Sequence, residues 1–247
     1  AAGTGKTRVI TSIVAHLTET GVEPRNVLLV TFTRRAAREM TLRAQAIAGR
    51  DLSEMTAGTF HSVCQRILRR HGPLVGLPSK FTILDGEDQA DLVRIARDEA
   101  LADRKDRASL PRPEWIAQTL SLADESGRPL PAVIVEQNPR LADRVDDLVT
   151  ICEAYTRAKR EAGAVDYADL LTLTVRLLHE HPDVRARLAA DFRWVLVDEL
   201  HDVNAPQAAI VEALGEAGSR VIAVADPDQS IYAWRGANFQ NILKFPD

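Results

Sequence analysis

Short continuous runs of apolar residues alternate with longer stretches in which apolar residues recur every three or four positions. Residues 26–32, 194–197 and 220–225 are runs of the first kind, and each is followed by a polar residue. Strands that are covered on both faces have this composition. Two shorter extended segments are predicted at residues 56–60 and 81–84.

The helical pattern fills much of the sequence between these runs. An apolar stripe from Val9 to Leu17, closed by Gly21, predicts a buried helix over residues 7–20. Further helices are predicted over residues 34–48, 61–70, 167–179 and 206–214. Strands that alternate with helices predict an α/β fold, a parallel sheet with right-handed crossovers and helices on both faces.

The middle of the chain breaks this alternation. Asp85 and Asp88 predict a capped helix start, and residues 85–165 contain almost no strand pattern. We therefore predict an inserted all-α subdomain at 85–165. Residues 1–84 and 166–247 would together form the α/β domain.

Composition narrows the class of protein. The 247 residues are 45% hydrophobic with no apolar run of 18, so no membrane span is expected. No secretory signal peptide is recognisable. Cys64 and Cys152 are far apart and lack metal-ligand spacing, which favours a reducing compartment without a zinc site.

The net charge is −4, yet residues 31–80 hold nine Lys/Arg against three Asp/Glu.

The first seven residues, AAGTGKT, match the final part of the P-loop pattern G-x-x-x-x-G-K-[ST]. The first residue of that pattern would lie just before Ala1. Gly3 and Gly5 allow backbone N–H groups to surround phosphate oxygens, Lys6 supplies a positive charge, and the Thr7 hydroxyl can bind Mg²⁺. This predicts a P-loop NTPase. The nucleotide is expected to contact Ala2, Gly3, Thr4, Gly5, Lys6, Thr7 and Arg8.

A pair of carboxylates, Asp198 and Glu199, follows the apolar run at 194–197. Open α/β sheets bind ligands at the carboxyl edge of their strands. Asp198 would hold Mg²⁺ through water opposite Thr7. Glu199 would orient or deprotonate the attacking water.

Residues 226–237, DPDQSIYAWRGA, follow the last apolar run. Gln229 is placed to sense the γ-phosphate. Tyr232 and Trp234 are close together in a polar stretch, and an exposed aromatic ring stacks on a base with about 1–3 kcal/mol. The alternative is that Trp234 packs in the core.

Hydroxyl, aromatic and basic side chains gather at two strand–helix turns, TFTRR and GTFHS. Hydroxyls, backbone N–H groups and helix N-termini bind phosphate without reading sequence. These turns predict a sequence-independent single-strand site at Thr31, Phe32, Thr33, Arg34, Thr59, Phe60 and His61.

Taken together and in order, the motifs resemble the first RecA-like domain of the UvrD/PcrA-type superfamily 1 DNA helicases. The matching segments are AAGTGKT, TFTRRAAREM, AGTFHSVCQRILR, FTILD, VDYADLL, VLVDELHDVN and VADPDQSIYAWRGA. The resemblance implies that ATP is served by Lys6, Thr7, Asp198, Glu199 and Gln229. It implies a DNA track along Thr31, Phe32, Thr59, Phe60, His61, Tyr232 and Trp234, with Arg235 connecting the two sites.

The same resemblance implies a bacterial, cytoplasmic, nucleoid-associated enzyme that uses ATP and Mg²⁺ to move 3′ to 5′ along single-stranded DNA and separate duplexes in repair or recombination. Its expected partners are single-stranded DNA, single/double-strand junctions, repair proteins and a second RecA-like domain. That domain supplies arginine fingers in the family. We therefore expect the 247 residues alone to hydrolyse ATP very poorly.

One segment departs from the family pattern, which usually has an aromatic–Gln pair followed by Asp-Thr after Asp-Glu. Here Leu200-His201-Asp202-Val203-Asn204 follows, so His201 replaces the amide expected to link ATP to DNA. Two alternatives stay open. The protein could be the motor subunit of a helicase–nuclease, or an ATP-gated single-strand binding module that does not translocate.

Overall fold

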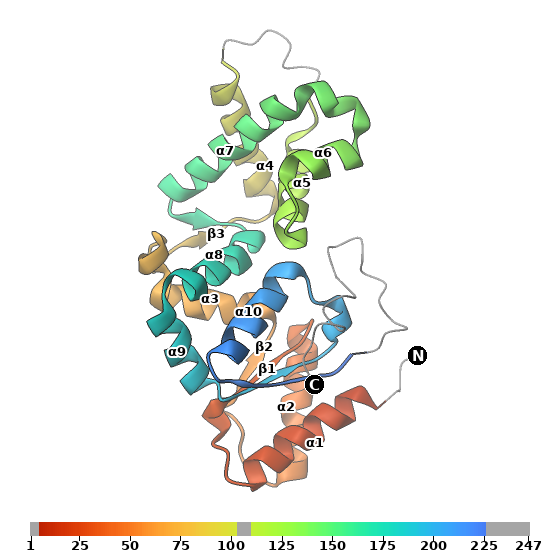
Figure 1. Ribbon diagram of the computed structural model, residues 1–247, viewed down its shortest axis with the longest axis vertical. Coiled ribbons are helices and arrows are strands. Elements are labelled where there is room, and N and C mark those ends of the chain that lie inside the picture. The colour runs from red at the N-terminus through yellow and green to blue at the C-terminus, as the bar shows by residue number, and fades with distance from the viewer. Residues whose placement is uncertain (1–4, 103–109, 226–247) are drawn as a thin grey trace. The chain divides into compact units, whose positions relative to one another are not determined.

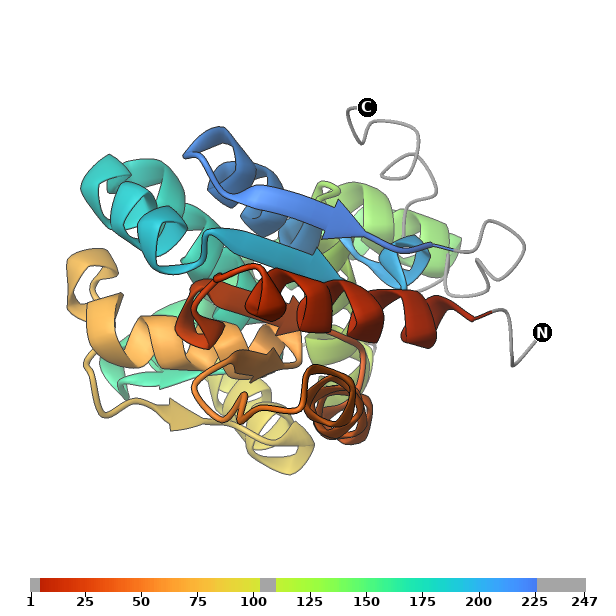
Figure 2. The same cartoon turned by 90° about the horizontal axis from the view of Figure 1, so that it is seen from below.

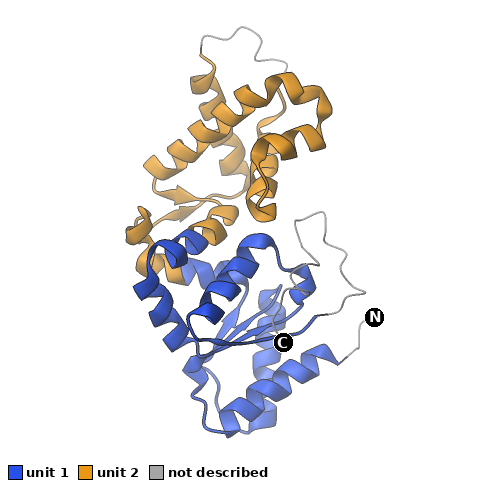
Figure 3. Ribbon diagram, viewed as in Figure 1, with its two compact units in different colours: residues 1–66, 174–247 blue, residues 67–173 orange. Residues whose placement is uncertain are grey.

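The computed structural model describes residues 5–102 and 110–225 (Figure 1). Its backbone contacts divide the chain into two compact units, coloured separately in Figure 3. Unit 1 comprises residues 1–66 and 174–247, and unit 2 comprises residues 67–173. The residues predicted as an insertion, 85–165, all belong to unit 2. The boundaries of the insertion itself stay a prediction.

Unit 1 contains a parallel four-stranded sheet in the order β2-β1-β5-β6. The strands are β1 Val27–Val30, β2 Thr56–Gly58, β5 Trp194–Val197 and β6 Arg220–Ala223. Every residue of β1 is buried, as the apolar run predicted. The predicted parallel α/β sheet is therefore confirmed.

Helices cover both faces of this sheet, with α1 and α2 on one side and α10 on the other (Figures 1 and 2). Ile10 and Val14 of α1 pack with Leu29 and Leu196 of the sheet and with Met40 of α2. The helical elements are α1 Lys6–Glu19, η1 Pro24–Asn26, α2 Arg34–Ala48, α9 Pro182–Asp191, η5 Leu200–Asp202 and α10 Ala205–Glu216. Two helices, α3 Phe60–His71 and α8 Tyr167–Glu180, continue from one unit into the other.

Unit 2 is mainly helical around a core that includes Val93, Ile116, Leu148 and Ile151. Its helical elements are η2 Gly72–Val75, α4 Gly86–Ala100, α5 Pro113–Ser126, α6 Leu130–Gln137, η4 Pro139–Arg144 and α7 Val145–Glu161. The predicted cap is present, because Asp85 and Asp88 form a reciprocal capping box at the start of α4.

Two features of the fold differ from the sequence prediction. The run at 81–84 forms β3 Thr82–Ile83, which pairs with β4 Ala164–Val165 in a separate two-stranded sheet of unit 2 and not in the main sheet. The short strand β4 and the helix α9 were not predicted. Within the two described ranges, no helix has the length and hydropathy that crossing a membrane requires.

Candidate nucleotide and nucleic-acid site

The nucleotide side of the site begins at the start of α1. Gly5 precedes the helix with φ 82°, a left-handed conformation that favours glycine. Lys6 is the first helical residue, and its Nζ lies 2.9 Å from Glu199 Oε2. The structure thus brings together a lysine and a carboxylate that are 193 positions apart and belong to two different motifs.

Glu199 owes its position to a sharp turn after β5. The Asp198 N–H donates to the Val30 carbonyl, and the Leu200 N–H donates to the Val224 carbonyl, both at 2.9 Å. Glu199 lies between these two bonds and has a left-handed backbone conformation, with φ 54°. Non-glycine residues in this region cost about 1–3 kcal/mol and cluster at functional sites.

Asp198 is buried, and its two carboxylate oxygens have different environments. Oδ2 accepts a hydrogen bond of 3.2 Å from the Thr31 hydroxyl. Oδ1 is buried without a hydrogen-bond partner among the described residues. Burial, and then the charge of Glu199, raise the pKa of Asp198, while Thr31 and Lys6 oppose the rise. An orphaned buried carboxylate oxygen is suited to a cation or to a water bound to one.

His201 is buried, and its Nε2 lies 3.2 Å from Glu199 Oε2 and 3.8 Å from Asp202 Oδ1. Lys6 and His201 therefore both approach the same oxygen of Glu199. The sequence drew attention to His201 only as a departure from the family pattern. The contact with Glu199 was not predicted, because it depends on the left-handed turn.

A cavity of about 130 Å³ joins the acidic pair to residues predicted for DNA. Asp198 and Glu199 line it together with Asp202, Val203 and Gln207 from the following segment. The remaining lining residues come from the two hydroxyl-rich turns: Thr31, Phe32, Thr59, Phe60 and His61. The carboxyl ends of neighbouring parallel strands thus place both motif sets around one space.

The residues predicted to bind DNA differ in the exposure of their side chains. Phe32 is 50% exposed and can meet a base, whereas Phe60 is 7% exposed and lines the cavity from a mostly buried position. Burial lowers the pKa of His61, which favours a neutral imidazole over a cation for phosphate. Thr33 uses its hydroxyl to cap α2 by accepting from the Ala36 N–H. Arg34 is exposed in the first turn of that helix.

Thr7 is half-buried and Arg8 is exposed in the first turn of α1. The other predicted residues lie outside the described ranges: Ala2, Gly3, Thr4, Gln229, Tyr232, Trp234 and Arg235. Among residues 5–102 and 110–225, no three His, Cys, Asp or Glu side chains are grouped as a metal cage. Both cysteines are buried, and burial raises the pKa of each thiol to about 12.

A parallel α/β sheet with a lysine at a helix start and an aspartate–glutamate pair at its carboxyl edge defines a nucleotide-binding domain of the RecA-like class. The chain belongs to the UvrD/REP helicase N-terminal domain family, which matches residues 1–247.

Several similar proteins are bacterial helicases. The chain is 36% identical over 246 residues to "ATP-dependent DNA helicase PcrA" of Staphylococcus aureus (strain Mu50), covering 99% of this chain and 33% of that protein. It is 37% identical over 251 residues to the protein of the same name from Leuconostoc citreum, covering 99% and 32%. The chain thus spans about a third of the length of these relatives.

Proposed function

We propose that the protein carrying this chain is an ATP-dependent DNA helicase that moves 3′ to 5′ along single-stranded DNA, with this chain as the ATP-binding half of the motor. One observation carries the proposal. A single cavity is lined by Asp198 and Glu199 and also by the exposed Phe32 with the threonines of both turns. Nucleotide chemistry and strand binding would thus meet in one cavity.

The Lys6 ammonium group lies against Glu199. The β- and γ-phosphates of ATP carry more negative charge than one carboxylate, so Lys6 would move to them and release Glu199 to orient or deprotonate the attacking water. His201 would then remain beside Glu199 and hold that carboxylate in place.

Mg²⁺ would be held by the Thr7 hydroxyl at the start of α1 and, through water, by Asp198, whose buried Oδ1 has no hydrogen-bond partner among the described residues. Mg²⁺ retains several waters readily, so a water-mediated carboxylate suits this ion. The ion would neutralise charge on the β- and γ-phosphates. The chain's own contribution would be the Asp198 carboxylate and the Thr7 hydroxyl that hold the ion.

Thr31 connects the two functions. Its hydroxyl donates to Asp198 Oδ2, and the next residue is the exposed Phe32. A shift of Asp198 when nucleotide binds would therefore reach the base-stacking side through one hydrogen bond and one peptide unit. Gln229, Tyr232, Trp234 and Arg235 are proposed to complete this connection.

The remaining features of the function extend beyond this chain. We propose that the partners are single-stranded DNA, single/double-strand junctions, repair proteins and a second RecA-like domain, and that the protein acts in the bacterial cytoplasm at the nucleoid. Residues 85–165 are proposed as a helical insertion. The alternatives are the motor subunit of a helicase–nuclease and an ATP-gated module without translocation.

Two substitutions test the nucleotide site. Lys6→Ala should abolish productive ATP binding, because it removes the charge that meets the phosphates. Glu199→Gln should keep ATP bound and slow hydrolysis by about 10²-fold or more, because it removes the base and leaves Asp198. ATP affinity and steady-state hydrolysis by the protein measure both effects.

The exposed Glu212 on α10 offers a matched control. Glu212→Gln makes the same chemical change away from the cavity and should leave both quantities unchanged. Unaltered hydrolysis in Lys6→Ala, or loss of ATP affinity in Glu199→Gln, would contradict the assigned roles.

A further inference from the structure

His201 lies beside the cavity described above without lining it. Its neighbours in the sequence, Glu199 and Asp202, both line that cavity. The imidazole is only 2% exposed, whereas the side chain of Glu199 is 29% exposed. A molecule bound in the cavity would therefore meet Glu199 directly, and His201 would act on that molecule through Glu199.

The backbone after β5 holds the imidazole at this place. The Leu200 N–H donates to the Val224 carbonyl at 2.9 Å, and the single turn η5 follows. Within this turn the Asp202 N–H donates to the Glu199 carbonyl, also at 2.9 Å. The turn thus carries His201 back to the side chain of Glu199, where Nε2 lies 3.2 Å from Oε2.

The surroundings of Nε2 identify it as a hydrogen-bond donor. An ionised carboxylate offers only acceptors, and two carboxylates lie close to this nitrogen: Glu199 Oε2 at 3.2 Å and Asp202 Oδ1 at 3.8 Å. Without a hydrogen, Nε2 would set its lone pair against both oxygens. Oδ1 of Asp202 is buried without a hydrogen-bond partner in the part of the chain that the structure describes, so it too favours a donor here.

Two donors approach the same oxygen of Glu199. Lys6 Nζ lies 2.9 Å from Oε2, the atom that also faces His201. The second oxygen, Oε1, takes part in neither contact and is the one left for the attacking water. A general base must lie within about 2.6–3.2 Å of the group whose proton it takes, so a fixed Oε2 sets the place of Oε1.

The position of His201 also separates it from the predicted DNA track. The resemblance to the helicase family implied that residue 201 links ATP to DNA. Both turns predicted to bind DNA line the cavity, and His201 does not. Its contact is with the carboxylate predicted to act on water, so an effect on hydrolysis requires no DNA.

We propose that His201 is a positioning residue for ATP hydrolysis, in which its Nε2–H holds Oε2 of Glu199 and leaves Oε1 to the attacking water. This inference rests on the proposed function, because it requires Glu199 to act on that water. It assigns His201 to the hydrolysis step itself, with or without a bound strand, and not to the link between ATP and DNA.

Substitution by Gln and by Met tests the role of the nitrogen. Gln can place an amide N–H where Nε2 lies, whereas Met has the same length and no donor. His201→Gln should keep kcat within about threefold of the parent, and His201→Met should lower it about tenfold or more, because a hydrogen bond to a charged group is lost.

Steady-state hydrolysis is measured without DNA and with saturating oligothymidylate. His201→Met should lower kcat by the same factor in both conditions. The KM for ATP should stay within about twofold, because Lys6 and Thr7 still meet the phosphates and Mg²⁺. A loss confined to the DNA-stimulated rate would assign His201 to the link with DNA and overturn the proposal, as would full activity of His201→Met.

A double variant shows whether the effect passes through Glu199. In the Glu199→Gln background, adding His201→Met should change the remaining rate by less than about twofold, because residues that act as a unit are not additive. Losses that multiply would contradict the positioning role. If Glu199→Gln alone leaves hydrolysis unchanged, the proposed function fails at Glu199; if only His201→Met is fully active, this inference alone fails.

His71→Met is the matched control. It makes the same change at another buried histidine, which does not line the cavity, and should leave kcat unchanged. If His201→Met lowers the thermal midpoint, His201→Asn decides. Its amide is polar but too short to reach the place of Nε2, so it should lose as much rate as Met, and an Asn variant as active as the Gln variant would rule the proposal out.

Discussion

Among single residues, Glu199 best separates what its sequence motif predicts from what only the structure shows. Its type and place after a buried strand were predicted from the sequence, but its left-handed backbone was not. That conformation depends on bonds to Val30 and Val224, which are distant in sequence. The same turn brings His201 to Glu199, so this contact could not be predicted from the order of residues alone.

Asp124 in unit 2 supplies a prediction about pH. Burial, followed by the charge of Asp166, raises the pKa of Asp124 from its usual 3.8 to about 6, although Lys159 opposes the rise and Asp169 and Glu125 add to it. The folded protein then binds more protons than the unfolded chain between about pH 4 and 6. Stability from this group is present below pH 4 and is lost as pH rises through 6.

Asp124→Asn should therefore stabilise the protein above pH 6, by roughly 1–2 kcal/mol after allowance for partial exposure. It should also flatten the dependence of stability on pH between 4 and 6. Urea unfolding at a series of pH values measures both. A variant that is less stable than the parent at pH 7 would show that the ionised carboxylate is favourable in the fold.

At the scale of elements, prediction succeeded where a segment was capped or continuously apolar and failed where its apolar pattern was short or weak. The capped start of α4 and the strand β5 agree with their predictions. Strand β4 has two residues, too few for any periodic pattern to appear. Helix α9 was missed because its ten residues bury only Val184, Leu188 and Ala189 in a charged segment.

The junction of α7 with α8 depends on one buried lysine. Lys159 Nζ lies 2.6 Å from Asp166 Oδ2 and 2.6 Å from Asp169 Oδ2, and the Tyr155 hydroxyl donates to Asp166 at 3.0 Å. Lys159 and Asp166 are almost fully buried. Removing one partner of such a network leaves uncompensated buried charge.

Lys159→Met should therefore lower the free energy of unfolding by about 3–5 kcal/mol, because two carboxylates lose their cation. The comparison is Arg176→Met, which breaks the exposed pair with Glu180 on α8 and should cost about 1 kcal/mol or less. Chemical denaturation of both variants provides the measurement. Equal losses in the two would mean that burial adds nothing to the Lys159 network.

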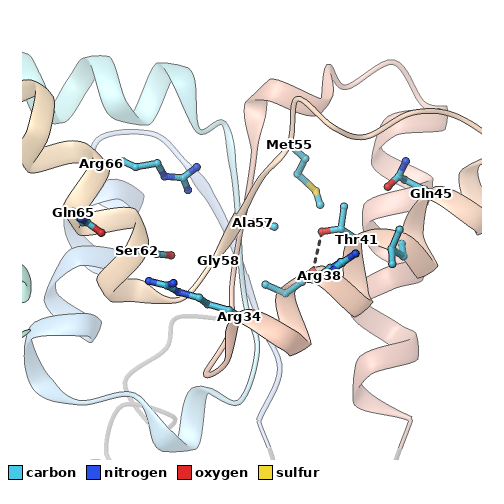
Figure 4. Close-up of a pocket in the computed structure, with 12 residues that line it drawn as sticks. Arg34, Arg38, Thr41, Gln45, Met55, Ala57, Gly58, Ser62, Gln65 and Arg66 are labelled. Carbon is cyan, nitrogen blue, oxygen red and sulfur yellow. Dashed lines mark hydrogen bonds between the residues drawn. The ribbon is translucent and has the colours of Figure 1, made fainter.

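At the scale of the whole molecule, the sequence predicted a parallel sheet but not the order of its strands. Thr31 and Asp198 were each predicted to follow a strand, and the structure adds that they are neighbours joined by a hydrogen bond. The order β2-β1-β5-β6 depends on pairing between distant segments and leaves β2 at an edge. A pocket beside that edge strand gathers Arg34, Arg38 and Arg66 (Figure 4), which the sequence showed only as part of a basic stretch.

ATP hydrolysis at Glu199 is proposed to drive movement along a single strand. This movement can be measured as displacement of streptavidin from biotin at either end of an oligonucleotide. The protein should displace streptavidin from the 5′ end in the presence of ATP and much more slowly from the 3′ end, and Glu199→Gln should bind the strand without displacing it. Robust ATP hydrolysis with no displacement from either end would contradict the claim and favour an ATP-gated binding module.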